Sequence, residues 1–135
     1  MKKIKYPSSE DVEWAHNRIL DLTGGERGDL AKANLEFVLD RMKEIGERLG
    51  FHEAIVKKAA FLLHSLVTQH PFINGNKRTA FEALKVFLEP NGYIINASDD
   101  EIYTLLGLIS KGQASLTQVE EWMETNLAKN PRRSN

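Results

Sequence analysis

The chain has 135 residues, of which 41% are hydrophobic and 27% are charged, and this ordinary globular composition argues against intrinsic disorder. Its 18 Lys and Arg residues against 19 Asp and Glu leave a net charge of −1, so charge gives no overall case for binding nucleic acid or a membrane surface. The absence of cysteine excludes disulfides, a thiol nucleophile and thiolate metal ligands, and it fits a reducing cytoplasm.

No apolar run approaches the roughly 18 residues that a membrane-spanning helix needs. The basic start of the chain has no apolar segment behind it, so it does not resemble a secretory signal. We therefore expect a cytoplasmic protein with one domain over residues 1–135, a core at about 8–127 and a frayed tail at 130–135.

The first half of the chain predicts two helices. Ser8 or Ser9 can cap the first, which stops at the glycines that follow Thr23, and Asp29 can cap the second, which ends at Gly50. Helical spacing predicts the buried residues of the first helix as Val12, Ala15, Ile19 and Leu22, and those of the second as Leu30, Ala33, Phe37, Ile45 and Leu49.

The second half predicts four more helices. One is expected from about His52 to Gln69, and the next from Asn76 or Lys77 to just before Pro90. Residues 93–95 suggest a short extended piece, with too little around it to build a sheet. Capping boxes then begin two further helices, Ser98 with Glu101 and Ser115 with Gln118, whose apolar residues are Ile102, Leu105, Leu106, Ile109, Leu116, Val119, Trp122 and Leu127. The fold class is therefore all-α, a compact bundle of about six helices.

The turn between the third and fourth helices carries unusual chemistry for a connector. A helix opens after Gly75 with unbonded backbone N–H groups, and Lys77 and Arg78 add two cations beside them, which predicts an anion site suited to phosphate. Two cations at a helix N-terminus oppose the helix dipole, a cost that a bound anion offsets. His70, across the turn, can act as a general base, so the corner predicts transfer of a phosphorus group to a hydroxyl.

A structural corner is the alternative interpretation of this turn. In that case Pro71 breaks one helix, Asn74 or Asn76 caps the next, and the two cations only point to water.

Residues 70–80, His-Pro-Phe-Ile-Asn-Gly-Asn-Lys-Arg-Thr-Ala, resemble the signature of the Fic/Doc superfamily, specifically its death-on-curing (Doc) branch. Similar segments at 23–28, 58–64 and 87–93, with Trp122, extend the resemblance over about residues 8–127. It implies an all-α fold that binds ATP and Mg²⁺. The residue roles that it implies are His70 as general base, Phe72 as a core anchor, Asn74 as the Mg²⁺ ligand, Gly75, Asn76 and Lys77 as the phosphate cradle, and Arg78 as a clamp on phosphate oxygens.

Lys77 stands where Fic proteins that transfer AMP commonly have glycine. The resemblance therefore implies a protein Ser/Thr kinase that transfers the terminal phosphate of ATP, with a target like elongation factor Tu. The inhibitory helix motif of many Fic proteins is missing, so the same resemblance implies a toxin restrained by a separate antitoxin. Transfer of AMP is an alternative. A catalytically silent partner-binding module is another, kept open by Asn74, since a neutral amide is a weaker Mg²⁺ ligand than a carboxylate.

The remaining histidines, tryptophans and lysines are expected to have structural roles. His16, His52 and His64 lack metal-ligand spacing and are expected to be surface or capped-core histidines, with His64 nearest the motif. The two tryptophans, Trp14 and Trp122, are expected to pack, and the pair Lys57-Lys58 is expected to be solvated.

Overall fold

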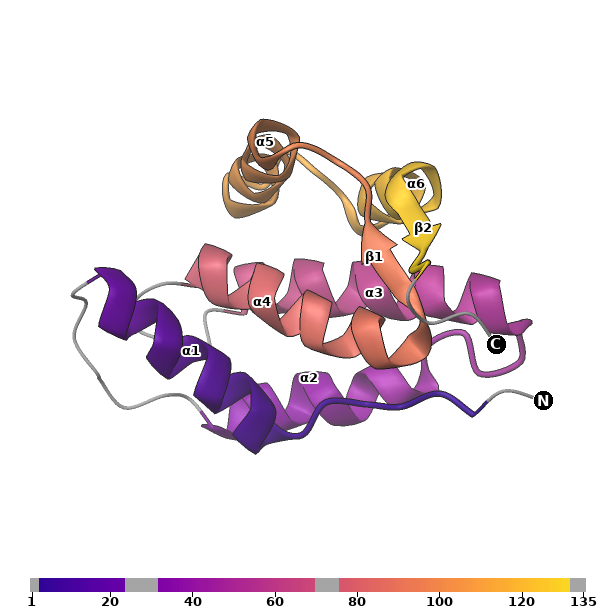
Figure 1. Cartoon of the computed structure of the whole chain (residues 1–135), viewed down its shortest axis with the longest axis horizontal. Coiled ribbons are helices and arrows are strands. Elements are labelled where there is room, and N and C mark those ends of the chain that lie inside the picture. The colour runs from indigo at the N-terminus through magenta and orange to yellow at the C-terminus, as the bar shows by residue number, and fades with distance from the viewer. Residues whose placement is uncertain (1–2, 24–31, 70–75, 132–135) are drawn as a thin grey trace.

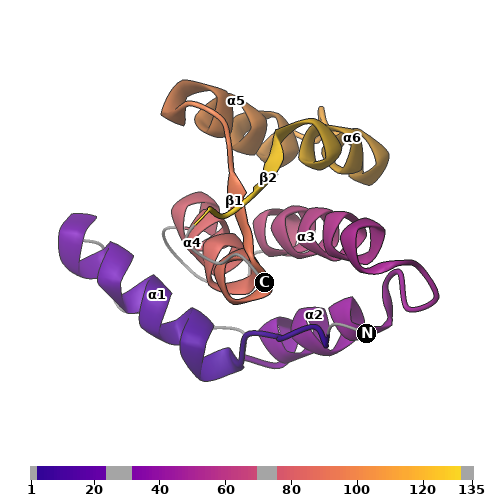
Figure 2. The ribbon, with the colours of Figure 1, turned by 45° about the vertical axis from the view of Figure 1, so that its right-hand side comes forward.

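The computed structural model describes residues 3–23, 32–69 and 76–131, and it confirms the all-α class. Figures 1 and 2 show three layers of helices in this part of the chain, with α1 and α2 on one side of the α3–α4 pair and α5 and α6 on the other. The elements are α1 (Ser9–Thr23), α2 (Lys32–Glu44), α3 (Phe51–Thr68), α4 (Asn76–Leu88), the 3₁₀ turn η1 (Glu89–Asn91), β1 (Tyr93–Ile95), α5 (Asp99–Ser110), α6 (Leu116–Asn126) and β2 (Leu127–Lys129). None of the helices in the described ranges could cross a membrane.

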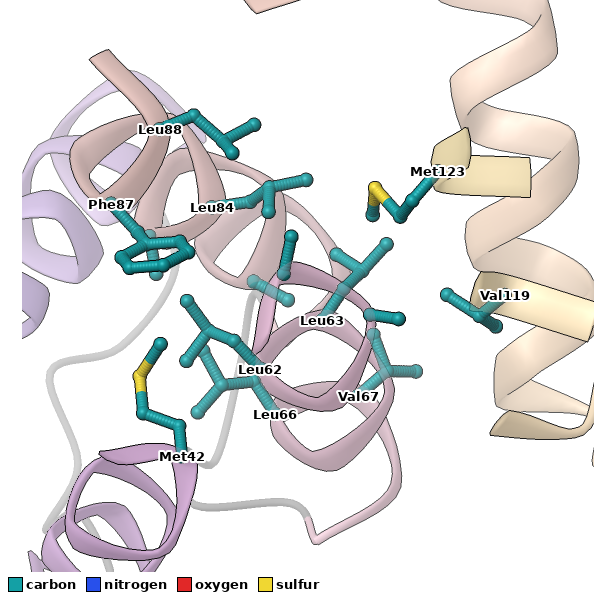
Figure 3. Close-up of a cluster of buried hydrophobic side chains, with 14 of the residues drawn as sticks. Met42, Leu62, Leu63, Leu66, Val67, Leu84, Phe87, Leu88, Val119 and Met123 are labelled. Carbon is teal, nitrogen blue, oxygen red and sulfur yellow. The ribbon is translucent and has the colours of Figure 1, made fainter. Parts of the chain in front are cut away.

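The core is built around α3, which buries side chains on opposite faces. Figure 3 shows Leu62 and Leu66 on the side of Met42 in α2, whereas Val67 lies toward Val119 in α6. These side chains are all buried, and burying one aliphatic side chain contributes about 1.5–3 kcal/mol. Because α3 packs against both outer layers, it fixes where the middle layer, and therefore the start of α4, lies.

The start signals predicted for the first, fifth and sixth helices are confirmed. Ser8 accepts a hydrogen bond on its Oγ from the N–H of Asp11, whose carboxylate accepts one from the Ser8 N–H. Both predicted capping boxes form, at the beginning of α5 and of α6. Each of these helices therefore begins at the residue that satisfies its first free backbone N–H groups.

The predicted buried stripe of α2 is wrong. Phe37 is 62% exposed and Leu49 is 40% exposed, while the side chains that enter the core are Leu35, Val38, Leu39 and Met42. The helix ends at Glu44 and not at Gly50, because the chain turns at Gly46 with φ of +69°, a conformation that favours glycine. A Cβ at Gly46 would also lie 3.3 Å from the Ala54 Cα. The predicted cap Asp29 and the stripe residue Leu30 lie outside the described residues.

The outer face of α1 also differs from expectation. Trp14 is 60% exposed and Leu22 is 76% exposed, although both were expected to be buried in the bundle. The Arg18 guanidinium lies over the Trp14 ring, 5.0 Å from its centroid. Residues 14, 18 and 22 recur every four positions, so they form one stripe on the helix face opposite the buried His16 and Leu20.

Residues 93–95 do form a sheet, which corrects the expectation that they would not. β1 pairs antiparallel with β2, with Tyr93 opposite Lys129 and Ile95 opposite Leu127. The Asn130 N–H also donates to the Gly92 carbonyl at 2.9 Å, so Asn130 is not part of a frayed tail. The strand that completes the ribbon comes from the far end of the chain, and no local pattern around 93–95 points to it.

Lys58 is buried, against the expectation that it would be solvated. It is 1% exposed, and its Nζ donates to the carbonyls of Met42 at 3.1 Å and Lys43 at 3.0 Å. These carbonyls belong to the last turn of α2, where the helix dipole favours a cation. The Met42 carbonyl also accepts from the Ile45 N–H at 3.3 Å. The Nζ also lies 5.3 Å from the centroid of the Tyr6 ring. Lys58, a residue of α3, therefore binds the C-terminal end of α2.

Replacing Lys58 by Met should lower the free energy of unfolding by about 2–4 kcal/mol, because two hydrogen bonds from a charged donor in or near the core are lost. Urea unfolding measures the change. Lys57→Met is the matched control, since Lys57 is half-exposed and its ion pair with Glu120 (3.0 Å) should contribute no more than about 1 kcal/mol. Equal losses in the two variants would contradict the assignment of Lys58 as the C-terminal partner of α2.

Candidate active site

The site predicted from sequence lies where α3 ends and α4 begins. The Gln69 N–H donates to the Ser65 carbonyl at 2.8 Å and closes the last turn of α3, and α4 begins at Asn76, as predicted. Figure 1 shows α4 running back along α3, so the two ends lie at the same end of the bundle. The connection between them, with His70, Phe72, Asn74 and Gly75, lies outside the described residues.

Lys77 and Arg78 are exposed in the first turn of α4. Within the described residues, neither side chain has a carboxylate partner. Lys85, farther along the same helix, pairs with Glu82 at 2.7 Å. The first-turn cations therefore add to the positive end of the helix dipole without a described anion to balance them. This is the electrostatic condition for an anion site, and the exposure of both side chains is also what the structural-corner interpretation predicts.

A buried polar contact joins α1 to the first turn of α4. The His16 Nδ1 lies 3.0 Å from the Thr79 Oγ1, and the two residues are 3% and 0% exposed. Burial lowers the pKa of His16, which favours the neutral ring. His16 is thus a capped-core histidine, one of the two interpretations predicted for it. Its pairing with Thr79, the residue next to Arg78, was not predicted, although its position beside Ala15 on the buried stripe of α1 was a signal.

Neither His52 nor His64 belongs to a group of described side chains that could hold a metal ion. His52 contacts the Tyr93 Oη at 3.0 Å and Glu124 at 3.3 Å, at the far end of α3. Burial, and next the charge of Glu124, raise the pKa of Tyr93. His64 is half-buried on α3. In the part of the chain that the structure describes, no three His, Asp or Glu side chains are grouped so as to hold a metal ion.

A cavity lined by described residues is separate from this corner. It measures about 530 Å³ and lies between the N-terminal segment, the end of α2 and the beginning of α3, with Tyr6, Lys43, Phe51 and Lys58 among its walls. Lys77 and Arg78 do not line it. The Lys58 ammonium in its wall already donates to two carbonyls, so it offers little to a ligand.

Comparison with known proteins gives one family match. The model of the Fic/DOC family matches residues 6–88, which is more than half of the chain. The matched range runs from the segment before α1 to the end of α4 and includes residues 70–78. A search of the curated proteins found no match.

The buried state of His16 predicts a pH-dependent stability. Its pKa is lowered from the ordinary value of 6.5, so below that pH the unfolded chain binds a proton more readily than the folded chain does. The stability that comes from burying a neutral His16 is present above pH 6.5 and is lost on acidification. The free energy of unfolding should therefore fall between about pH 7 and pH 5.5. Urea unfolding across this range should give a shallower fall for His16→Gln. Asn91→Ala, a buried variant without a titrating group, should keep the original slope, and an unchanged slope in His16→Gln would contradict the assignment.

Proposed function

Because the chain belongs to the Fic/DOC family, whose members generally transfer phosphorus-containing groups to proteins, we propose that it is a Doc-type kinase acting on a Ser or Thr hydroxyl. ATP is the phosphate donor in this proposal, and a protein like elongation factor Tu is the target. The observation that carries it is the pair of exposed first-turn cations, Lys77 and Arg78, which have no carboxylate partner among the described residues.

The proposed reaction divides between the two sides of the corner. The target hydroxyl oxygen attacks the terminal phosphorus of ATP, the bond from that phosphorus to the bridging oxygen breaks, and ADP leaves. His70 takes the hydroxyl proton. The first-turn amides of α4, with Gly75, Asn76 and Lys77, hold the phosphates, and Arg78 stabilises the charge that develops on the transferred group.

Asn74 would be the protein ligand to Mg²⁺. The ion prefers oxygen ligands and commonly binds through one or two protein groups together with substrate phosphates and water, so an amide oxygen fits, as a weaker ligand than a carboxylate. When bound, Mg²⁺ neutralises charge on the phosphates.

Lys77 supports transfer of the terminal phosphate over transfer of AMP. A glycine at the same place would leave the phosphate site open, whereas a lysine fills part of it and adds a charge beside the cradle. This difference favours a nucleotide held with its terminal phosphate toward the hydroxyl. Transfer of AMP stays the rival chemistry.

Labelled ATP distinguishes the two reactions. With purified protein added to a cell extract, label from γ-phosphate-labelled ATP should reach a protein target, and label from α-phosphate-labelled ATP should not. His70→Ala should abolish the transfer. Label carried only from the α-phosphate would overturn the kinase assignment in favour of AMP transfer.

Two lysines of α4 provide the matched control for this assay. Lys77→Ala and Lys85→Ala each remove one charge, but only the first lies at the N-terminal turn. Lys77→Ala should abolish transfer while raising the free energy of unfolding by about 0.3–1 kcal/mol, because a cation leaves the positive end of the helix. Lys85→Ala should keep the transfer and lower stability by about 0.3–0.5 kcal/mol through loss of the Glu82 pair. Equal transfer by the two variants would count against the cradle.

The proposal includes a separate antitoxin. The exposed stripe of Trp14, Arg18 and Leu22 supports this part, because apolar side chains that are exposed together on one face are typical of interaction surfaces. The opposite face of α1 contacts the first turn of α4 through His16, so a partner on the stripe is one helix away from the cradle.

The same stripe suits a silent binding module. Growth arrest that survives His70→Ala would favour that module, and purification of the chain alone from its native cells would count against an antitoxin.

A further inference from the structure

One buried polar contact is not required by the packing of the bundle. His16 and Thr79 lie in the interface between α1 and α4, where apolar side chains such as Val12 and Ala80 are fully buried. Burying polar groups costs free energy unless they are hydrogen bonded, and replacing both partners by apolar groups of similar shape is often neutral. The fold alone therefore gives little reason for a histidine and a threonine here.

The place of the contact points to its role. Thr79 is the fourth residue of α4 and directly follows Lys77 and Arg78. The first turn of a helix is held by fewer backbone hydrogen bonds than its interior, because its N–H groups have no intrahelical partner. A side-chain bond from α1 therefore adds a constraint at the turn that carries the two cations.

We propose that His16 is a positioning residue: its hydrogen bond to the Thr79 Oγ1 fixes the first turn of α4 and thereby the direction of Lys77 and Arg78. This inference rests on the proposed function for its catalytic consequence. The neutral ring can make the bond either way, with the Nδ1–H donating to the hydroxyl oxygen or with the hydroxyl donating to Nδ1. A displacement of a catalytic group by about 1 Å can cost about 100-fold in rate.

The other end of α4 has a comparable anchor that serves as a control. The Asn91 side chain donates to the Phe87 carbonyl at 2.7 Å and to the Lys5 carbonyl at 2.8 Å, and it accepts from the Lys5 N–H at 2.9 Å. Asn91 is 8% exposed. Removing it should lower stability without touching the first turn.

The activity test compares kcat and the KM for ATP in variants of the two anchors. His16→Ala, His16→Gln and Thr79→Val should lower kcat by about 100-fold, with a smaller change in KM. His16→Asn should restore kcat to within a few-fold, because the asparagine amide occupies the place of Nδ1, whereas glutamine extends to the place of Nε2. Asn91→Ala should leave kcat unchanged. If Asn91→Ala lowers kcat as much as His16→Ala, or if asparagine rescues no better than glutamine, the positioning role is overturned.

Amide hydrogen exchange tests the same claim without any activity. The N–H groups of Ala80 and Phe81 bond to the carbonyls four residues back, in the first turn of α4. His16→Ala should speed their exchange by about tenfold, the effect of losing one net hydrogen bond, while His16→Asn and Asn91→Ala should not. Unchanged exchange in His16→Ala would refute the positioning role. Absence of transfer by the wild type, together with the expected exchange pattern, would refute the proposed function and leave the positioning of the turn established.

Discussion

The burial of α3 between two layers is the constraint on which the rest of the structure depends. Its side chains at 62 and 66 pack toward α2 while that at 67 packs toward α6, so the helix cannot shift toward one layer without opening a cavity against the other. Because α4 packs against α3, its position is fixed as well. The end of α3 and the beginning of α4, which flank residues 70–75, are therefore held by a helix with buried side chains on both sides.

Cationic side chains lie at both kinds of helix end in this structure. Lys58 is buried at the C-terminal end of α2, where carbonyls and the helix dipole both favour a positive charge. Lys77 and Arg78 stand at the N-terminal end of α4, where the dipole opposes them. The first arrangement stabilises the fold on its own. The second is unfavourable unless an anion offsets it, and a local conflict of this kind is common at functional sites.

Polar contacts at both ends of α4 fit this division. Asn91 ties one end to the N-terminal segment, and His16 ties the other to α1. Buried hydrogen bonds are directional, and one of them adds only about 0.5–1.5 kcal/mol of net stability, so such contacts fix orientation more than they add stability. The end of the helix that carries the cations is thus held in direction as well as in place.

The sequence by itself predicted the starts of α1, α5 and α6 and the order of the helices, and it is the source of the chemistry proposed for the candidate site. The caps at Ser8, Ser98 and Ser115 involve residues three apart, so a local pattern contains all the groups that form them. The motif at 70–80 likewise lies within one segment, and the start of α4 at Asn76 follows from it.

The tertiary structure alone decided which faces are buried and which distant groups meet. Phe37 is exposed because α2 turns the face with Leu35 and Met42 to the core instead. The pairing of β1 with β2 and the contact of His16 with Thr79 join residues far apart in the chain. Periodicity specifies that a helix has an apolar side, but only packing against other elements selects the partner, because the hydrophobic effect is not directional.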